Sequence, residues 1–305
     1  MNKKILVIGS ANTDMVIKTK HFPLPGETVL GGRFIMNPGG KGANQAIAAA
    51  RLGGQITFIT KIGNDIFGRQ ALQQFLKEGV NAGYVISDPD NPSGVALITV
   101  DEKGENAIVV APGSNGTLSP EDVTKAEAVF AEAEIILMQL EIPLPTVLFA
   151  ADLAARYSKK VILNPAPAAL LPYELYRNLY IITPNRSEAE ALTGVLIKDL
   201  ATTEQAAQKL RQKGIANVVI TLGTEGAFAY NDSLAKLIPA TLVTAVDTTA
   251  AGDVFNGALA VSLAEGLELD VAVEFANQAA AISVTRMGAQ ASAPFRKELL
   301  SAPLK

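Results

Sequence analysis

The strongest candidate for a chemical site is the segment Asp247–Gly257, in which small residues precede a helical pattern. Ala250, Ala251 and Gly252 would leave backbone N–H groups open at a helix N-terminus, where the helix dipole also favours negative charge. Such an anion hole can stabilise the charge that develops on a phosphoryl group during its transfer. Asp253 would lie in the first helical turn beside it. A first-turn Asp often only stabilises its helix, but that role requires no run of small residues ahead of it.

A second segment, Asn37–Gln45, places three glycines before an Ala-rich helical stretch. Glycines let the backbone approach a ligand closely, and Asn44 adds a side-chain amide. The segment is not a Walker A loop, because Gly42 follows Lys41 where Ser or Thr is required. A loop before a tightly packed helix would have the same composition. The segment alone therefore leaves a binding role and a packing role equally open.

A third segment, Asn185-Arg186-Ser187-Glu188, opens another helical pattern. Asn followed three residues later by Glu is typical of a capping box at a helix N-terminus. The same amide and carboxylate, near a phosphate site, would suit hydrated Mg²⁺, which usually keeps several of its waters. The chain contains no GxGxxG motif, which argues against a dinucleotide-dependent dehydrogenase.

The composition removes several classes of chemistry. The 305 residues include no Cys and a single His. A thiol nucleophile, an iron–sulfur cluster, a Cys-ligated zinc site and a site with several histidines are therefore excluded within this chain. His21 lies in a loop-like, Pro-rich stretch, which is more typical of a surface or lid residue than of a general base. Any chemistry must use carboxylates, hydroxyls, backbone dipoles and a bound cofactor.

Charge and hydropathy narrow the set of partners. The net charge is -4, and cationic residues occur at most two in a row, as at Lys3-Lys4 and Lys159-Lys160, which argues against a nucleic-acid partner. The N-terminal apolar run Ile5–Gly9 is too short for the apolar region of a signal peptide. No apolar stretch reaches the roughly 18 residues of a membrane-spanning helix. We expect a cytoplasmic protein without a membrane partner.

The elements that must position these segments follow from hydrophobic periodicity. Short β-branched runs alternate with Ala-rich amphipathic stretches, which predicts an α/β protein with a mostly parallel sheet covered by helices on both faces. The predicted strands are Ile5–Gly9, Ile56–Ile62, Ile135–Leu140, Val161–Asn164, Tyr180–Thr183 and Val218–Leu222, with a further β-rich stretch at Leu242–Val246. The predicted helices are Ala43–Leu52, Phe67–Glu78, Pro120–Ala133, Thr146–Tyr157, Ser187–Thr193, Thr203–Lys213, Gly252–Glu265 and Asp270–Arg286.

Some segments do not fit this alternation. Gly94–Val100 and Asn106–Ala111 flank a polar turn and predict a hairpin, and Glu27–Met36 follows a Pro-Gly turn. Together with Met15–Lys18 they suggest a small antiparallel sheet that projects from the main one. Because no linker or repeat interrupts the pattern, we interpret residues 1–305 as one domain.

Polar residues follow the predicted strands at one edge of the sheet. Ligands of open α/β sheets bind beyond the carboxyl ends of the strands, so these residues are candidates for one shared site. They are Ser10, Asn12 and Asp14, then Glu141, Asn164, Asn185 and Glu188, and finally Gly223.

Taken in order, these motifs resemble the PfkB family of carbohydrate kinases over essentially the whole chain. Gly39–Gln45 resembles the first family signature, Asp247–Gly257 the second, and Asn185-x-x-Glu188 the magnesium-associated motif. Local stretches such as Ser10–Asp14, Gln139–Glu141 and Asn164–Pro167 are similar to the ribokinase branch in particular. The resemblance implies a three-layer α/β/α ribokinase-like fold with a small β-sheet lid, and transfer of the ATP γ-phosphoryl group to the 5-hydroxyl of D-ribose.

The resemblance also implies roles for individual residues. Asp253 would be the base, and Ala250, Ala251 and Gly252 would form the anion hole. The residues that would bind ribose are Asn12, Asp14, Gly40, Lys41, Gly42, Asn44 and Glu141, with Asp253. The residues that would bind ATP are Asn185, Thr221, Gly223, Gly226, Gly252 and Asn277. Glu188 would hold Mg²⁺ through water. The residues beside a monovalent cation, usually K⁺, would be Asp247, Thr249, Ser283, Arg286, Gly288 and Ser292.

Further consequences of the resemblance concern assembly and specificity. Paired lids would make a homodimer. Asn277 stands where some ribokinases carry His, so its contact with adenine would differ. Other interpretations are a kinase of the same family for fructose, a deoxyribose or a nucleoside, and a non-catalytic sugar sensor. Asp14 and the glycine loop favour a small polyhydroxylated sugar over a nucleoside.

Overall fold

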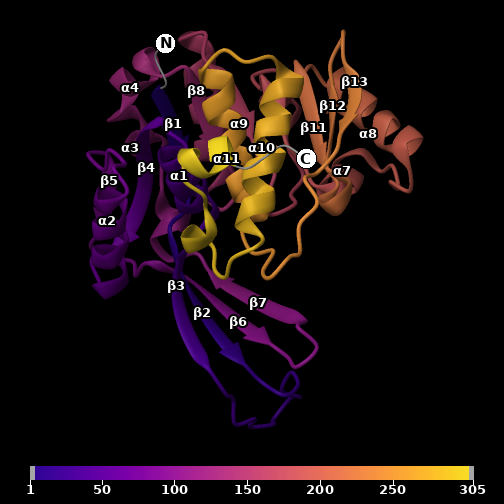
Figure 1. The fold of residues 1–305 in the computed structure, drawn as a ribbon. Coiled ribbons are helices and arrows are strands. Elements are labelled where there is room, and N and C mark those ends of the chain that lie inside the picture. Colours follow the sequence, from indigo (N-terminus) through magenta and orange to yellow (C-terminus); the bar gives the residue numbers. More distant parts are fainter. Residues whose placement is uncertain (1–3, 302–305) are drawn as a thin grey trace.

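The computed structural model describes residues 4–301 and is built on a nine-stranded central sheet with the order β13-β12-β11-β10-β9-β8-β1-β4-β5 (Figure 1). The strands from β11 to β5 in this order run parallel to one another. At the other edge, β12 pairs antiparallel with both β11 and β13. The strands are β1 (Lys4–Ile8), β4 (Gln55–Gly63), β5 (Val85–Asp88), β8 (Ile135–Met138), β9 (Lys160–Leu163), β10 (Ile181–Ile182), β11 (Asn217–Thr221), β12 (Ala227–Tyr230) and β13 (Ala235–Ile238).

Helices cover both faces of this sheet, because the central strands are apolar on both sides. Ile135–Met138, for example, is buried at every position. One face packs on α1 (Lys41–Arg51), α2 (Ile66–Lys77), α9 (Ala251–Ala264) and α10 (Leu269–Ser283). The other packs on α3 (Pro120–Thr124), α4 (Glu127–Glu132), α5 (Leu144–Arg156), α6 (Tyr173–Tyr176), α7 (Arg186–Thr193) and α8 (Leu200–Gln212). A last helix is α11 (Arg296–Ser301). The predicted three-layer architecture is confirmed.

A second, four-stranded sheet projects from the body beside the carboxyl end of β1 (Figure 1). Its order is β3-β2-β6-β7, with β2 (Asn12–Lys18), β3 (Phe34–Gly39), β6 (Gly94–Val100) and β7 (Asn106–Ala111). The predicted hairpin is confirmed with its boundaries. The expected antiparallel sheet is instead mixed, because the hairpin joins it through a parallel pairing of β6 with β2. The strand expected at Glu27–Met36 instead begins at Phe34, because Gly31 and Gly32 weaken strand formation ahead of it. His21 lies exposed in the loop between β2 and β3.

Three other expectations differ from the structure. The helix predicted at Pro120–Ala133 is divided into α3 and α4, because a turn at Ala126 lets Val123 and Phe130 both pack into the same core. Leu242–Val246 forms no strand. Its last N–H, that of Val246, donates to the Val284 carbonyl at the end of α10 instead of to a strand. Helix α10 itself ends at Ser283 and not at Arg286.

Five predicted strands extend too far at their carboxyl ends. Two of them, β1 and β11, end one residue earlier than expected, at Ile8 and Thr221. Of the other three, β8 ends at Met138, β9 at Leu163 and β10 at Ile182. Gln139, Asn164 and Thr183 follow these strands directly and are buried. Their side chains form hydrogen bonds with other polar side chains instead of packing into the apolar core. Among the described residues, no helix has both the length and the apolar character needed to cross a bilayer.

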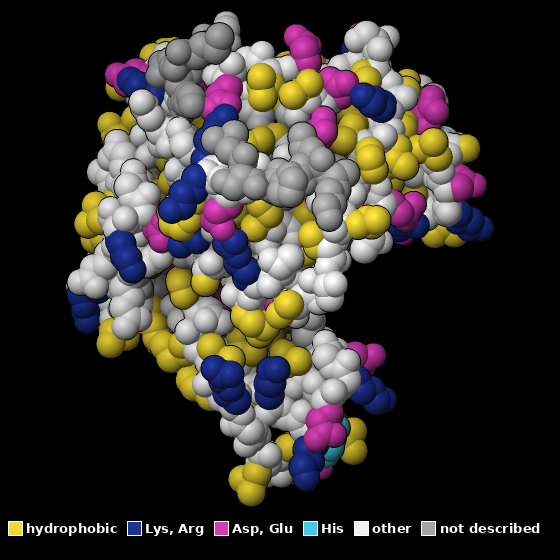
Figure 2. All heavy atoms as spheres, viewed as in Figure 1, with side chains coloured by type: hydrophobic (Ala, Val, Ile, Leu, Met, Phe, Trp, Pro, Cys, Tyr) yellow, Lys and Arg dark blue, Asp and Glu magenta, His cyan; other side chains and the backbone are white. Residues whose placement is uncertain are grey.

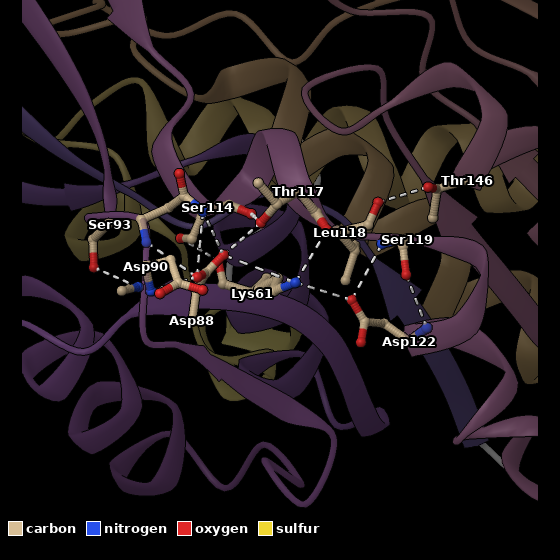
Figure 3. A network of polar contacts seen from close by, with 12 residues as sticks. Lys61, Asp88, Asp90, Ser93, Ser114, Thr117, Leu118, Ser119, Asp122 and Thr146 are labelled. Carbon is tan, nitrogen blue, oxygen red and sulfur yellow. Dashed lines mark hydrogen bonds and ion pairs between the residues drawn. The ribbon is translucent and has the colours of Figure 1, made fainter.

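A buried ion cluster fixes the root of the small sheet (Figure 3). Lys61 on β4 donates from Nζ to Asp122 Oδ2 at 3.2 Å and to the Thr117 carbonyl at 3.1 Å, with Asp88 Oδ2 3.8 Å away. Thr117 ends the 3₁₀ turn η1 (Gly113–Thr117), which follows β7 almost immediately. The Ser114 hydroxyl in the same turn donates to the Lys61 carbonyl at 2.9 Å. The cluster therefore ties the end of the small sheet to the central sheet.

Asp88 in this cluster makes stability depend on acid pH. The Thr117 hydroxyl, with the N–H groups of Asp90 and Asn91, lowers the pKa of Asp88 to about 2. Because the folded-state pKa lies below the unfolded value of about 3.9, the carboxylate stabilises the fold above pH 4. That contribution is lost as the pH falls toward 2. We expect Asp88→Asn to lower the melting temperature at pH 7, with a difference from wild type that shrinks between about pH 4 and pH 2.

Asp90→Asn is the matched control, since it makes the same change of charge at an exposed neighbour. Differential scanning calorimetry across this pH range measures both variants. A difference between Asp88→Asn and wild type that stays constant with pH would contradict the assignment.

Candidate active site

Two helix N-termini converge at the carboxyl edge of the sheet without side-chain caps. Helix α1 begins after Gly40, whose φ is 88°, and α9 begins after Ala250, whose φ is 59°. A positive φ is unusual for alanine and turns the chain sharply into the helix. Gly252, in the first turn of α9, is exposed, and a Cβ built on it would meet nothing within 4 Å. The surface of α9 at Gly252 is thus open, whereas the N–H of Ala251 donates to the Thr248 carbonyl at 3.3 Å.

Close packing brings these two helix starts together. A Cβ at Gly257 of α9 would lie 2.8 Å from the Gln45 carbonyl oxygen and 2.9 Å from Ala48 Cβ. A Cβ at Gly42 of α1 would lie 2.6 Å from the Gly9 carbonyl carbon at the end of β1. Only glycine allows both approaches, so these glycines of the two sequence motifs are required for the packing of the helices.

Asp253 lies between the two helices and is buried, with 6% of its surface exposed. Asn44 Nδ2 donates to its Oδ2 at 2.9 Å, and Gln45 Nε2 donates to its Oδ1 at 3.0 Å. Burial raises the pKa of Asp253, whereas Lys41 and the two amide donors lower it, and the net shift is upward. A carboxylate with a raised pKa is a better proton acceptor than an exposed one, provided that it remains ionised.

The residues expected to bind sugar surround this carboxylate. Asn12 and Asp14 lie on β2 against the glycine loop: a Cβ at Gly39 would be 2.2 Å from Asp14 Oδ2, and one at Gly40 would be 2.7 Å from the Asn12 nitrogen. Glu141, which follows β8, accepts from the Lys41 N–H at 3.0 Å and from the Ser10 hydroxyl at 2.5 Å. The structure therefore brings all of these predicted residues to one place.

The charges at this place are mutually dependent. Burial alone would lower the pKa of Lys41, but Asp253, Glu141, Glu188 and Asp14 together raise it. Burial, reinforced by Glu141 and Asp253, raises the pKa of Asp14 to about 6. Four acids surround one lysine, so an anionic ligand here needs further positive charge, either from backbone N–H groups or from cations.

A cleft of about 650 Å³ opens beside Gly252 on the other side of α9. Its volume lies within the usual range of small-molecule sites. All the residues expected to bind ATP line it, namely Asn185, Thr221, Gly223, Gly226, Gly252 and Asn277. Asn277 is engaged with the protein, since its Nδ2 donates to the Ile238 and Pro239 carbonyls at 3.0 and 3.2 Å. Leu222, Val243 and Phe255 supply apolar lining.

Asn185 and Glu188 form the capping box that their spacing predicts. The Glu188 N–H donates to Asn185 Oδ1 at 2.9 Å, and the Asn185 N–H donates to Glu188 Oε2 at 2.8 Å. Burial raises the pKa of Glu188, and its charge acts on Lys41 and Asp253. Within residues 4–301, no group of three or more acidic or His side chains is arranged to hold a metal directly. A hydrated Mg²⁺ carried by phosphates fits this site, because Glu188 can reach it through water.

The six residues expected beside a monovalent cation lie in two segments, one before α9 and one that runs from the end of α10 to Ser292. A hydrogen bond between Asp247 and Gly288 joins the two segments. Asp247 Oδ1 accepts from Thr249, and Asp247 Oδ2 accepts from the Gly288 N–H at 2.8 Å. Ser283 and Arg286 form the turn after α10, where the Arg286 N–H donates to the Ser283 carbonyl. Ser292 is buried in the 3₁₀ turn η3 (Gln290–Ser292). Carboxylate and carbonyl oxygens are suitable ligands for a hard cation.

Sequence reasoning assigned no role to three buried amides at the site, Gln45, Gln139 and Asn115, and it named Asn164 only as a candidate at a strand end. Gln45 contacts Asp253, Gln139 and Asn164 contact Gln45, and Asn115 in η1 contacts Asn12. Gln139 and Asn164 were included in predicted strands. The available signal was a polar residue at the carboxyl end of an otherwise apolar run.

Comparisons with known proteins agree with this geometry. The model for the pfkB family carbohydrate kinases matches residues 2–296. The chain is 45% identical over 300 residues to a ribokinase of Haemophilus influenzae, covering 98% of each chain. It is similar to the crystal structure of a ribokinase from Thermotoga maritima (TM-score 0.89, 42% identity, 97% and 98% of the two chains). It is also similar to the structure of Arabidopsis thaliana ribokinase complexed with ribose and ATP (TM-score 0.91, 30% identity, 98% of each chain).

Proposed function

The chain belongs to the pfkB family of carbohydrate kinases, and we propose that it transfers the γ-phosphoryl group of ATP to the 5-hydroxyl of D-ribose. The observation that carries this proposal is the position of Asp253. Its carboxylate lies among Asn44, Lys41 and the residues of β2, while its helix N-terminus faces the cleft of about 650 Å³. A sugar hydroxyl on one side and a phosphoryl group on the other would meet at this carboxylate.

The proposed mechanism depends on positioning and charge more than on strong basicity. Phosphoryl transfer passes through a loose transition state, so the hydroxyl loses its proton late. Asp253 accepts that proton as the hydroxyl oxygen bonds to phosphorus. The N–H groups at Ala250, Ala251 and Gly252 stabilise the phosphoryl oxygens. Removing one such donor typically costs about 10²–10³ in rate.

Cations complete the charge balance of the proposed site. Mg²⁺ would neutralise phosphate charge, and Glu188 would hold it through water. A monovalent cation, K⁺ in our proposal, would lie beside Asp247, Thr249 and the turn at Ser283, where oxygen ligands gather. Asp247 fixes this region to Gly288, so the loops that precede α9 and follow α10 are held in one geometry.

The small sheet would act as a lid that excludes water from the sugar. Water competes with the sugar as a nucleophile, so its exclusion favours transfer over hydrolysis. Asp14 comes from this sheet, so the lid would contribute directly to sugar binding. Figure 2 shows the molecule hollowed between this sheet and the body.

A sugar-panel kinase assay tests the substrate assignment. We expect kcat/KM for D-ribose to exceed that for fructose, deoxyribose and a nucleoside by at least about tenfold. A site that hydrogen-bonds a hydroxyl rejects an analogue lacking it, as deoxyribose and a nucleoside do, and fructose presents its hydroxyls in a different arrangement. We also expect the rate to rise when K⁺ is added. Preference for another sugar would assign a different substrate within the family. Hydrolysis of ATP stimulated by ribose without a sugar phosphate would favour a sensor.

The role of Asp253 is tested by Asp253→Asn, which keeps the shape of the side chain and removes its ability to accept a proton. We expect phosphorylation to fall at least about 100-fold. Ribose binding, measured by isothermal titration calorimetry, should persist, since Asn12, Asp14 and Lys41 remain. Near-normal turnover of the variant would remove Asp253 from the role of base.

We further propose that the protein is a homodimer joined through the small sheet. The strand register places Met36, Met15, Leu97 and Val109 in one row on the same face. Leu97 is 53% exposed and Val109 is 68% exposed, which is a large apolar surface to leave in water. Asp14 lies on the opposite face by the alternation of strand residues, so the apolar row faces away from the proposed sugar site.

Leu97→Lys tests this interface, because it puts a charge in the middle of the apolar row. We expect light scattering coupled to size-exclusion chromatography to give twice the chain mass for the wild-type protein and a single chain mass for the variant. Ile108→Lys is the control, since Ile108 is similarly exposed but lies on the other face. A monomeric wild-type protein, or dissociation by both variants alike, would contradict the proposed interface.

A further inference from the structure

Burial of Asp253 opposes its ionisation, and the charged groups around it do not compensate for this. The base must be ionised to accept a proton, but burial favours the neutral acid. Glu141 follows β8, Asp14 comes from β2 and Glu188 from α7, and each of them acts against a second negative charge. Lys41 on α1 is the one cation among the groups that act on Asp253. The remaining stabilisation must come from hydrogen-bond donors.

We propose that Gln45 is a positioning residue for Asp253: its amide holds the carboxylate, and Asn164 and Gln139 fix the direction in which that amide points. The proposal rests on the proposed function, in which Asp253 is the base. It concerns a residue behind the carboxylate, because Gln45 is completely buried and lies outside the set of proposed sugar-binding residues.

The direction of the Gln45 amide follows from a backbone carbonyl. Asn164 Nδ2 donates to the Thr183 carbonyl at 3.2 Å, and a carbonyl can only accept. Asn164 Oδ1 must therefore face Gln45, and Gln45 Nε2 donates to it at 3.1 Å. The same Nε2 then has its second hydrogen available for Asp253 Oδ1 at 3.0 Å. The end of β10 thus determines that Gln45 presents a donor to the carboxylate.

Gln139 completes the arrangement from β8. Its Nε2 donates to Gln45 Oε1 at 2.5 Å, so the Gln45 oxygen is occupied and turned away from Asp253. The reversed amide would place an oxygen against the carboxylate and leave Gln139 facing another donor. Gly9 accommodates Gln139, because a Cβ there would lie 2.1 Å from Gln139 Oε1.

The same network returns to the proposed anion hole. The Thr183 hydroxyl donates to Asn256 Oδ1 at 2.6 Å, and Asn256 Nδ2 donates to the Gly252 carbonyl at 2.8 Å. Both ends of the network therefore lie in the first turn or two of α9, one at the carboxylate and one at the backbone of Gly252. Loss of the Gln45 amide would therefore act directly on the Asp253 carboxylate.

Gln45→Met tests the proposal, since Met has a similar shape and no donor. Loss of a hydrogen bond to a charged group should raise the pKa of Asp253 and move the acid limb of the kcat profile to higher pH by about one unit. The rate should recover at high pH, and KM for ribose should change less than threefold. A purely structural defect would lower kcat at every pH. An unchanged acid limb would overturn the proposal.

Asn217→Leu is the matched control, because Asn217 is a buried amide with comparable hydrogen bonds at the opposite end of the sheet, at the start of β11. It should lower the melting temperature and leave the acid limb in place. If Gln45→Met does not fold, Gln139→Met takes its place. It removes the donor to Gln45 Oε1, so that Asn164 alone holds the amide, and it should shift the limb in the same direction by a smaller amount. No shift in that variant would count against the proposal.

A direct titration separates this inference from the proposed function. ¹³C NMR of carboxyl-labelled aspartate, with the Asp253 signal assigned by its loss in Asp253→Asn, follows ionisation without turnover. Absence of sugar phosphorylation by the wild-type protein would overturn the proposed function, whereas the titration would still report on Gln45. The same Asp253 titration curve in wild type and Gln45→Met would overturn the inference, even in an active kinase.

Discussion

An ionised carboxylate buried at the start of a helix is the constraint on which the rest of the site depends. Removing a charge from water is costly unless donors replace the lost hydration. Asp253 obtains two amide donors from the adjacent helix α1, and Lys41 supplies the nearby positive charge. These groups reach the carboxylate only if α1 and α9 start at the same place and pack closely. The positions of both helices can be understood from this requirement.

Close packing also explains the concentration of small residues. The contact between α1 and α9 places Gly257 against Gln45 and Ala48, and the contact of α1 with β1 places Gly42 against Gly9. Larger side chains at these positions would move the amide donors by more than a hydrogen bond tolerates. The same residues leave the start of α9 without a side-chain cap and open at Gly252, whereas the first N–H groups of α1 donate to Glu141 and Ser10. One choice of small residues therefore serves both packing and binding.

The sequence was sufficient to predict those parts of the molecule that depend on local pattern. The parallel sheet, the hairpin of β6 and β7 and the two glycine-rich helix starts all follow from periodicity or turn residues. The amide network was not predictable, because Gln45 lies 94 residues from Gln139 and 119 from Asn164. Gln139 and Asn164 each continue an apolar run and look locally like strand residues, whereas Gln45 looks like a residue of the Ala-rich helix. Only the order of β8, β9 and β10 in the sheet brings them together.

Backbone groups set the direction of amides on both sides of the site. Near the base, the Thr183 carbonyl orients Asn164 and through it Gln45. At the root of the small sheet, Asn115 accepts from the Ala11 N–H at 2.9 Å, so its Nδ2 must donate to Asn12 Oδ1, at 2.7 Å. With its oxygen held in this way, Asn12 can offer a donor to a ligand. Because the backbone cannot exchange its donors and acceptors, the fold sets the direction of these side-chain amides before a ligand binds.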